Sequence, residues 1–265
     1  MELLVAALAG FAVAALTAPV GVSGAVLLLP VQLSALGMHG PQVSATNLLY
    51  NVVATPLGIA RLARSARGNG AQMLTVTAAA VPCAVAGAAV RVTWLSDPVL
   101  FRALLGVILF GMGVRLLFPS RRRAAPPRPQ RERGERGGRG LLATAAGGAA
   151  LLGAAVGIGG GSLLSPLLIG VAGWATARAA VVALTTTFTT SIVGLTAYAV
   201  FDRIGFGAAP AAPDWDTGLA LGVGGALGSL VGIALSRRVG EQPLRFLLGG
   251  LICLTGATYL VGLLT

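Results

Sequence analysis

Long apolar runs, separated by short breaks, dominate the sequence. They cover residues 3–18, 43–60, 72–94, 99–118, 141–156, 176–201, 217–236 and 244–264. An α-helix needs about 20 mostly apolar residues to cross the hydrocarbon core of a bilayer, which is roughly 30 Å thick. The pattern therefore predicts an all-α polytopic membrane protein.

Two further apolar stretches, residues 22–36 and 157–173, are interrupted by glycine and proline. Counterparts in the two stretches lie 136 positions apart: Gly21 and Gly157, Gly24 and Gly160, Pro30 and Pro166, Gly37 and Gly173. A constant offset indicates an internal duplication. We expect two inverted repeats of about four hydrophobic segments each, each with a Gly/Pro-broken re-entrant element facing a common substrate path.

Composition excludes an ordinary soluble domain. Hydrophobic residues make up 55% of the chain and charged residues 10%, against about 25% charged in soluble domains. The mean hydropathy is +0.86. A multi-pass protein of a bacterial-type inner membrane is the class that fits.

The positive charge is concentrated between the two predicted halves. All 19 basic residues are arginines, and residues 119–140 hold eight of them with two glutamates, a net charge of +6. Basic loops favour the cytoplasmic side of a membrane, so this distribution predicts a cytoplasmic linker and argues against nucleic-acid binding. The expected organisation is a first membrane repeat over 1–118, a basic linker over 119–140 and a second membrane repeat over 141–265.

The arginines also discriminate between two topologies. If residues 141–173 cross the membrane once, 13 arginines lie inside and 6 outside; if this segment enters and returns, 16 lie inside and 3 outside. The second arrangement fits the positive-inside rule better. It places both termini on the external side.

The broken segments and the polar helices after them suggest an anion site. Successive glycine N–H groups can converge on an anion, and the positive end of a short helix adds to the attraction. Hydroxyl and amide side chains at 43–60 and 176–201 would supply further donors. The candidate substrate-binding residues are Gly21, Ser23, Gly24, Ser44, Thr46, Asn47, Tyr50, Gly159, Gly160, Gly161, Ser162, Arg178, Thr185, Thr186 and Thr189. Alternatively, the glycines serve only close helix packing, the hydroxyls only helix contacts, and Arg178 only flanks the membrane.

The paired elements Gly-x-Ser-Gly…Pro at 21–30 and Gly-x-Gly-Gly-Gly…Pro at 157–166 resemble those of the TauE/SafE sulfite-exporter-like family, as do Ala45–Asn47 and Leu184–Thr186. The first element departs from the second, since Ser23 and Ala25 replace Gly159 and Gly161. The resemblance implies transport of sulfite, small organosulfonates or related anions.

We therefore expect a secondary transporter that exports a small sulfur-containing anion, with no cofactor and no metal. All eight carboxylates lie in loops or at segment ends, so the membrane potential, worth about 2.3 kcal/mol per charge per 100 mV, is the expected driving force. An anion channel, an uptake carrier using Cys83 or Cys253, and a non-transporting scaffold remain alternatives. No catalytic triad, metal cluster or nucleotide loop suggests an enzyme.

Overall fold

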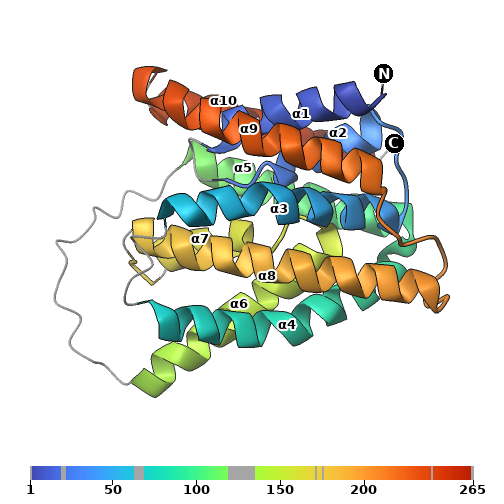
Figure 1. Cartoon of the computed structure of the whole chain (residues 1–265), viewed down its shortest axis with the longest axis horizontal. Coiled ribbons are helices and arrows are strands. Elements are labelled where there is room, and N and C mark those ends of the chain that lie inside the picture. The colour runs from blue at the N-terminus through green and yellow to red at the C-terminus, as the bar shows by residue number, and fades with distance from the viewer. Residues whose placement is uncertain are drawn as a thin grey trace.

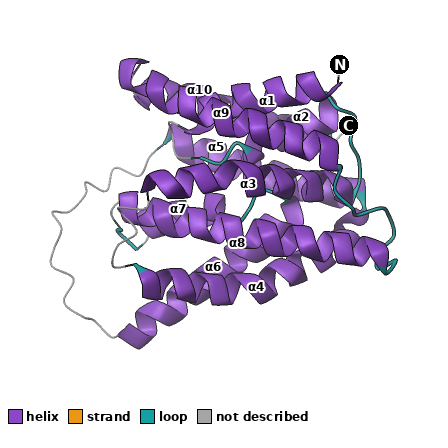
Figure 2. Cartoon of the chain, viewed as in Figure 1, coloured by secondary structure: helices purple, strands orange, loops and turns teal. Residues whose placement is uncertain are grey.

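The computed structural model describes residues 2–18, 22–62, 69–118, 135–170, 172–174, 176–239 and 241–263. Helices account for nearly all of this part of the chain, and it contains no strand (Figures 1 and 2). The α-helices are α1 (Glu2–Thr17), α2 (Ala25–Ser34), α3 (Pro41–Leu62), α4 (Gly70–Thr93), α5 (Pro98–Leu117), α6 (Glu135–Val156), α7 (Gly161–Gly170), α8 (Thr176–Arg203), α9 (Trp215–Val239) and α10 (Glu241–Val261).

Each predicted apolar run corresponds to one helix, and each predicted broken stretch contains a ten-residue helix, α2 or α7. The largest difference is at α6, which begins at Glu135, six residues before the predicted start at 141 and inside the predicted linker. The last proline before α6 is Pro129, so no missing N–H or ring clash prevents the helix from starting early. Residues 119–134 of the predicted linker lie outside the described residues.

Small residues let the long helices pack in close pairs: α1 with α9, α4 with α6, and α5 with α10. A Cβ on Gly10 of α1 would lie 2.2 Å from the carbonyl oxygen of Leu221 on α9. A Cβ on Gly87 of α4 would lie equally close, 2.2 Å, to the carbonyl oxygen of Leu151 on α6. Such close approach is typical of helix association in membranes, where small residues at the interface allow backbone contact.

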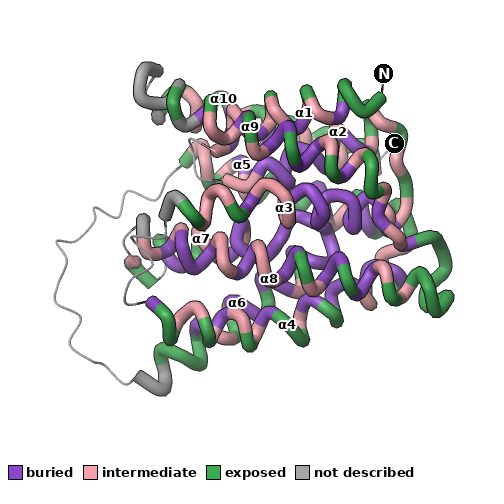
Figure 3. Tube along the Cα trace, in the orientation of Figure 1, coloured by how far each residue is buried: buried purple, intermediate pink, exposed green. Residues whose placement is uncertain are grey.

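The outer surface is apolar and the centre is buried. Leu74, Trp94 and Phe118 are exposed by 71%, 76% and 75%, whereas the buried residues gather around α2, α3 and α8 (Figure 3). By length and composition, five described helical segments are able to cross a membrane: Gly70–Ser96, Pro98–Leu117, Gly138–Val156, Arg178–Arg203 and Gln242–Val261. An apolar exterior around a partly polar interior is the arrangement that a bilayer requires.

The ends of the helices divide the bundle into two opposite ends (Figure 1). We call the end where α5 stops and α6 starts the linker end, and the end where both chain termini lie the termini end. α6 enters from the linker end and α7 returns toward it. The segment from α6 to α7 therefore runs into the bundle and turns back toward the linker end.

Candidate functional site

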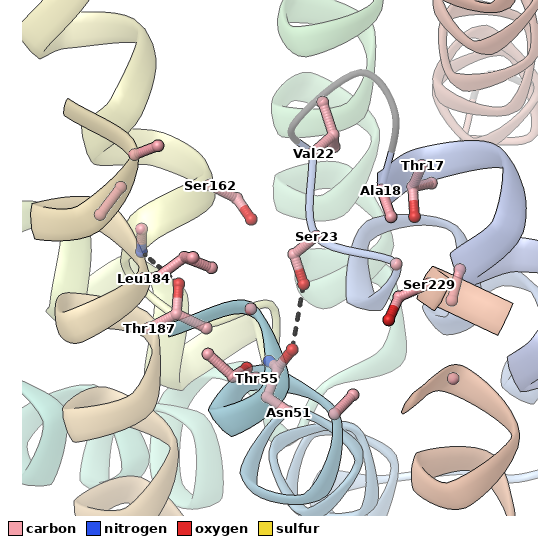
Figure 4. Close-up of a pocket in the computed structure, with 18 of the residues that line it drawn as sticks. Thr17, Ala18, Val22, Ser23, Asn51, Thr55, Ser162, Leu184, Thr187 and Ser229 are labelled. Carbon is pink, nitrogen blue, oxygen red and sulfur yellow. Dashed lines mark hydrogen bonds between the residues drawn. The ribbon is translucent and has the colours of Figure 1, made fainter. Parts of the chain in front are cut away.

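A cavity of about 990 Å³ lies where the chain breaks between α1 and α2 and between α6 and α7 (Figure 4). Its walls come from five helices, α1, α3, α7, α8 and α9, and from residues 22–24 just before α2. Its polar lining side chains are Thr17, Ser23, Tyr50, Asn51, Thr55, Ser162, Ser165, Thr187 and Ser229. The two glycine-proline elements, far apart in sequence, thus contribute to one cavity.

The first break presents Ser23 at the start of α2. Its hydroxyl donates to Asn51 Oδ1 on α3 at 3.0 Å and accepts from the Ala25 N–H at 3.3 Å. Gly24 makes room for Tyr50, because a Cβ at Gly24 would lie 2.3 Å from the Tyr50 hydroxyl oxygen. The ring of Tyr50 in turn needs Gly225 on α9, where a Cβ would lie 2.3 Å from a ring carbon.

The second break is a tight turn that only glycine adopts without strain. Gly157 and Gly159 have φ values of 89° and 72°, in the region that side-chain-bearing residues rarely occupy. Gly161 begins α7, and its N–H donates to Thr187 Oγ1 at 3.0 Å (Figure 4). A Cβ at Gly161 would lie 1.9 Å from the carbonyl oxygen of Ala183. Close packing and turn geometry therefore both depend on these glycines.

Asn47 links the two breaks from behind the cavity. Its Nδ2 donates to the carbonyl oxygens of Ala25 at 2.8 Å and Gly157 at 3.0 Å. Its Oδ1 accepts from Gln32 Nε2 at 3.1 Å. All of its hydrogen-bonding groups are engaged, so Asn47 acts as a brace between the two elements rather than as a donor to a ligand.

Of the residues predicted from the sequence to bind substrate, five line the cavity: Ser23, Gly24, Tyr50, Gly161 and Ser162. Gly159 and Gly160 are buried in the turn beside it without lining it. Gly21 lies outside the described residues.

The other polar candidates on α3 serve as structural contacts. Ser44 donates to the Ala155 carbonyl oxygen at 3.2 Å. Thr46 accepts from the Asp214 N–H at 2.9 Å and so holds the loop before α9. Both are fully buried away from the cavity.

The candidates on α8 also lie outside the lining. The hydroxyls of Thr185 and Thr186 donate back to their own helix, to the carbonyl oxygens of Val181 and Val182. Thr189 is half-buried and does not line the cavity. Arg178 stacks on the Trp174 ring, 4.3 Å from its centroid.

Sequence reasoning missed Asn51, Thr55 and Thr187, and a periodicity signal could have found them. Asn47, Asn51 and Thr55 recur every four residues and so share one helix face. The offset of 136 relates Asn51 to Thr187. Serines on other helices, Ser165 and Ser229, carried no such signal.

Two buried polar atoms at the cavity wall have no hydrogen-bond partner: Asn51 Nδ2 and Ser162 Oγ. Their side chains are 1% and 8% exposed, and Figure 4 shows the Ser162 hydroxyl directed toward the cavity. Buried polar atoms are usually paired, so these two are unsatisfied hydrogen-bonding groups beside the cavity.

The lining carries no charge at neutral pH: none of its described residues is Asp, Glu, Arg or His. The cysteines lie elsewhere, Cys83 facing Gly147 between α4 and α6 and Cys253 facing Gly113 between α10 and α5. In the described residues, no group of three or more His, Cys, Asp or Glu side chains is placed to hold a metal ion.

A family profile described as "Sulfite exporter TauE/SafE" matches residues 6–259. Searches of curated proteins and of solved structures gave no match to the chain. The profile covers almost the whole bundle, both glycine-proline elements included, and its members are membrane transporters rather than enzymes. The chain belongs to the TauE/SafE sulfite exporter family and is a multi-pass membrane protein for the transport of sulfur-containing anions.

Proposed function

We propose that this chain is a secondary transporter that exports sulfite or a small organosulfonate, binding the anion in the central cavity between its two halves. The observation that carries this proposal is the convergence of both glycine-proline elements on one cavity of about 990 Å³. Irregular backbone is tolerated at membrane depth only where it is buried in protein or lines a cavity. Here it does both.

The donors around the cavity suit an oxyanion. Ser23, Asn51, Ser162 and Thr187 bring hydroxyl and amide groups from both halves, and α2 and α7 each begin at the wall with the positive end of a helix dipole. Hydrogen bonds to a charged group contribute about 1.5–3 kcal/mol each. A few such bonds are enough to hold a small anion without a metal or cofactor.

The shape of the cavity favours a carrier over an open channel. The lining residues on long helices lie in the middle and second half of α3, the first half of α8, and the middle and second half of α9. The cavity therefore extends from the centre toward the linker end. Nearer the start of α3, Asn47 and Gln32 are fully buried and bonded to each other, and Arg91 donates to Ser44 Oγ at 3.2 Å and to the Gly40 carbonyl oxygen at 2.7 Å.

Helix contacts support inverted repeats over residues 1–118 and 141–265. In this proposal α1–α5 correspond in order to α6–α10, so each helix contact in the bundle should have a counterpart. The contact of α1 with α9 corresponds to that of α6 with α4, α3 with α9 to α8 with α4, and α2 with α3 to α7 with α8. α1 begins at the termini end and α6 at the linker end (Figure 1). Two hairpins that enter from opposite ends are the expected product of an inverted duplication.

With residues 119–134 in the cytoplasm, as their charge favours, the cavity faces the cytoplasm and the bound anion leaves toward the positive side of the membrane. This direction fits export driven by the membrane potential. The position of the cysteines, outside the cavity lining, gives no support to an uptake mechanism in which a thiol relays sulfur.

Anion efflux from proteoliposomes under an imposed potential tests the proposal. Wild-type protein should accelerate sulfite or sulfonate efflux, and an outside-positive potential should increase the rate. Ser162→Leu, which fills the cavity with apolar volume, should reduce efflux at least tenfold. Thr196→Leu changes an exposed hydroxyl of α8 outside the cavity and serves as the matched control.

Three results would contradict the proposal. Efflux insensitive to potential would remove the driving force, and a fully active Ser162→Leu variant would place the pathway elsewhere. Absence of transport for every sulfur anion, together with normal folding, would favour the scaffold alternative.

A further inference from the structure

We infer that the cavity selects singly charged oxyanions and rejects doubly charged ones. The inference rests on the proposed function, since it concerns the same cavity. It follows from the charge of the lining, the number of free donors and the cost of removing an ion from water.

The cavity wall offers an anion no formal positive charge. Its described lining residues are neutral, and Tyr50 is the one among them that titrates; a phenol is neutral at physiological pH. Two described arginines, one in contact with α7 and one near the start of α8, are engaged elsewhere. Arg115 donates to the Pro166 carbonyl oxygen on α7, and Arg178 stacks on Trp174.

Arg91, the most deeply buried cation of the described residues, is also directed away. Its guanidinium donates to Ser44 Oγ and to the carbonyl oxygens of Gly40 and Leu95, and it lies 3.8 Å from the centroid of the Phe101 ring. It does not line the cavity. Within the part of the chain that the structure describes, the donors that line the cavity are therefore neutral.

Two of these donors are free and come from different halves: Asn51 Nδ2 and Ser162 Oγ. Both side chains are more than nine-tenths buried, so a ligand that reaches them has lost much of its water. The cost of desolvating an ion is several kcal/mol in real proteins, and in the Born description it grows with the square of the charge. A dianion therefore loses about four times as much hydration as a monoanion of the same size, whereas its attraction to neutral dipoles only doubles.

This difference divides the sulfur oxyanions into two classes. Hydrogensulfite and simple alkanesulfonates such as methanesulfonate carry one negative charge, whereas sulfite, sulfate and thiosulfate carry two. For sulfite the bound form is then hydrogensulfite, which keeps its proton during transport. One negative charge and one proton leave together, and no protein carboxylate is required to carry the proton.

The test compares anions of different charge in proteoliposomes containing the full chain. Methanesulfonate should compete with a transported sulfonate at least tenfold better than sulfate or thiosulfate does. When the pH is raised across the titration of hydrogensulfite, flux at a fixed total sulfite concentration should fall in proportion to the hydrogensulfite that remains. Methanesulfonate flux should stay constant over the same range, which controls for titration of the protein.

A cation introduced into the wall should change the selectivity. Leu184 and Leu230 line the cavity from α8 and α9. Leu184→Arg should raise competition by sulfate relative to methanesulfonate at least tenfold, and Leu184→Gln, of similar size and neutral, should not. Leu230→Arg with Leu230→Gln repeats the comparison on another helix if the first arginine prevents folding.

The outcomes distinguish a failure of the charge selectivity from a failure of the proposed transport function. Equal transport of methanesulfonate, sulfate and thiosulfate by the wild-type protein would overturn the inference and leave the proposed function intact. So would sulfite flux that does not follow the hydrogensulfite fraction. Failure to move any of these anions would overturn the proposed function and this inference with it.

Discussion

At the scale of single residues, the glycines at the breaks matter for the space they leave. Gly24 and Gly225 leave room for Tyr50, and Gly161 lets α7 approach the backbone of α8. The N–H of Gly161 donates to Thr187 Oγ1, so this glycine also fixes a side chain at the cavity wall. Of the alternatives posed by the sequence, these contacts support packing, and binding stays a prediction.

Gly161→Ala should destabilise the protein and stop transport. The new Cβ would lie 1.9 Å from the Ala183 carbonyl oxygen and 2.3 Å from Thr187 Oγ1, so α7 must shift away from α8. Overpacking of this kind typically costs about 1–3 kcal/mol. Thermal unfolding in detergent and proteoliposome efflux measure the two effects.

Gly148→Ala is the matched control, since a Cβ at Gly148 meets no atom within 4 Å. There the substitution should stabilise α6 by about 0.5–1 kcal/mol, because alanine favours the helix. A Gly161→Ala variant as stable and active as Gly148→Ala would show that contact between α7 and α8 is not needed.

The polar residues show what the sequence could not predict at this scale. Periodicity predicts that Ser44, Asn47 and Asn51 face the interior of the bundle, and they do. Interior positions, however, include both the cavity wall and the contacts that close the other side. One turn along α3 separates Asn47, the brace, from Asn51, which lines the cavity. The pattern of hydrophobic and polar residues does not distinguish Asn47 from Asn51, because both are polar residues on the same buried face of α3.

At the scale of elements, the two short helices form one unit through Asn47. The carbonyl oxygens of Ala25 and Gly157 both accept from its amide, so α2 and the turn before α7 are fixed relative to each other. The sequence predicted these elements well, because glycine and proline mark breaks irrespective of tertiary context. It could not predict the brace, since the contact joins residues 110 positions apart.

Asn47→Leu should uncouple the two elements. The variant keeps a side chain of similar size but leaves two buried carbonyl oxygens and the Gln32 amide without their partner. Each unpaired buried group costs about 1–3 kcal/mol, so a clear fall in melting temperature and a loss of efflux are expected. Circular dichroism during heating and the proteoliposome assay provide the measurements.

Thr185→Val is the comparison variant for this experiment. Its hydroxyl donates only to Val181 of the same helix, so stability and transport should remain close to wild type. Should Asn47→Leu behave like Thr185→Val, the brace has no energetic role. Should Thr185→Val abolish efflux with a normal melting temperature, the sequence-based assignment of Thr185 to the substrate site would be restored.

At the scale of the whole molecule, the buried polar atoms suggest where the second half of the pathway lies. Thr190 and Ser191 on α8 are fully buried, and their hydroxyls lack hydrogen-bond partners. The offset of 136 relates them to Ala54 and Thr55, which line the open cavity. In an inverted repeat, the state open to the termini end would place Thr190 and Ser191 at its cavity wall, as this state places Ala54 and Thr55.

Such an exchange also explains why unpaired hydroxyls persist in the closed half. Leaving a polar group buried without a partner is unfavourable, and water would satisfy these hydroxyls in the alternate state. In this state the unpaired hydroxyls destabilise the closed half. They regain hydrogen bonds when that half opens to water and the half lined by Thr55 closes. Two conformations of similar stability are what a carrier needs to cycle between its two sides.

Site-directed cysteine labelling tests this exchange. In a background with alanine at Cys83 and Cys253, Thr55→Cys should react with a membrane-impermeant thiol reagent added on the side of residues 119–134. Ser191→Cys should react only from the opposite side. Conditions that increase labelling at one position should decrease it at the other, because one conformation exposes one position at a time. Labelling of both positions from the same side, or from both sides at once, would instead indicate a channel with a continuous pore.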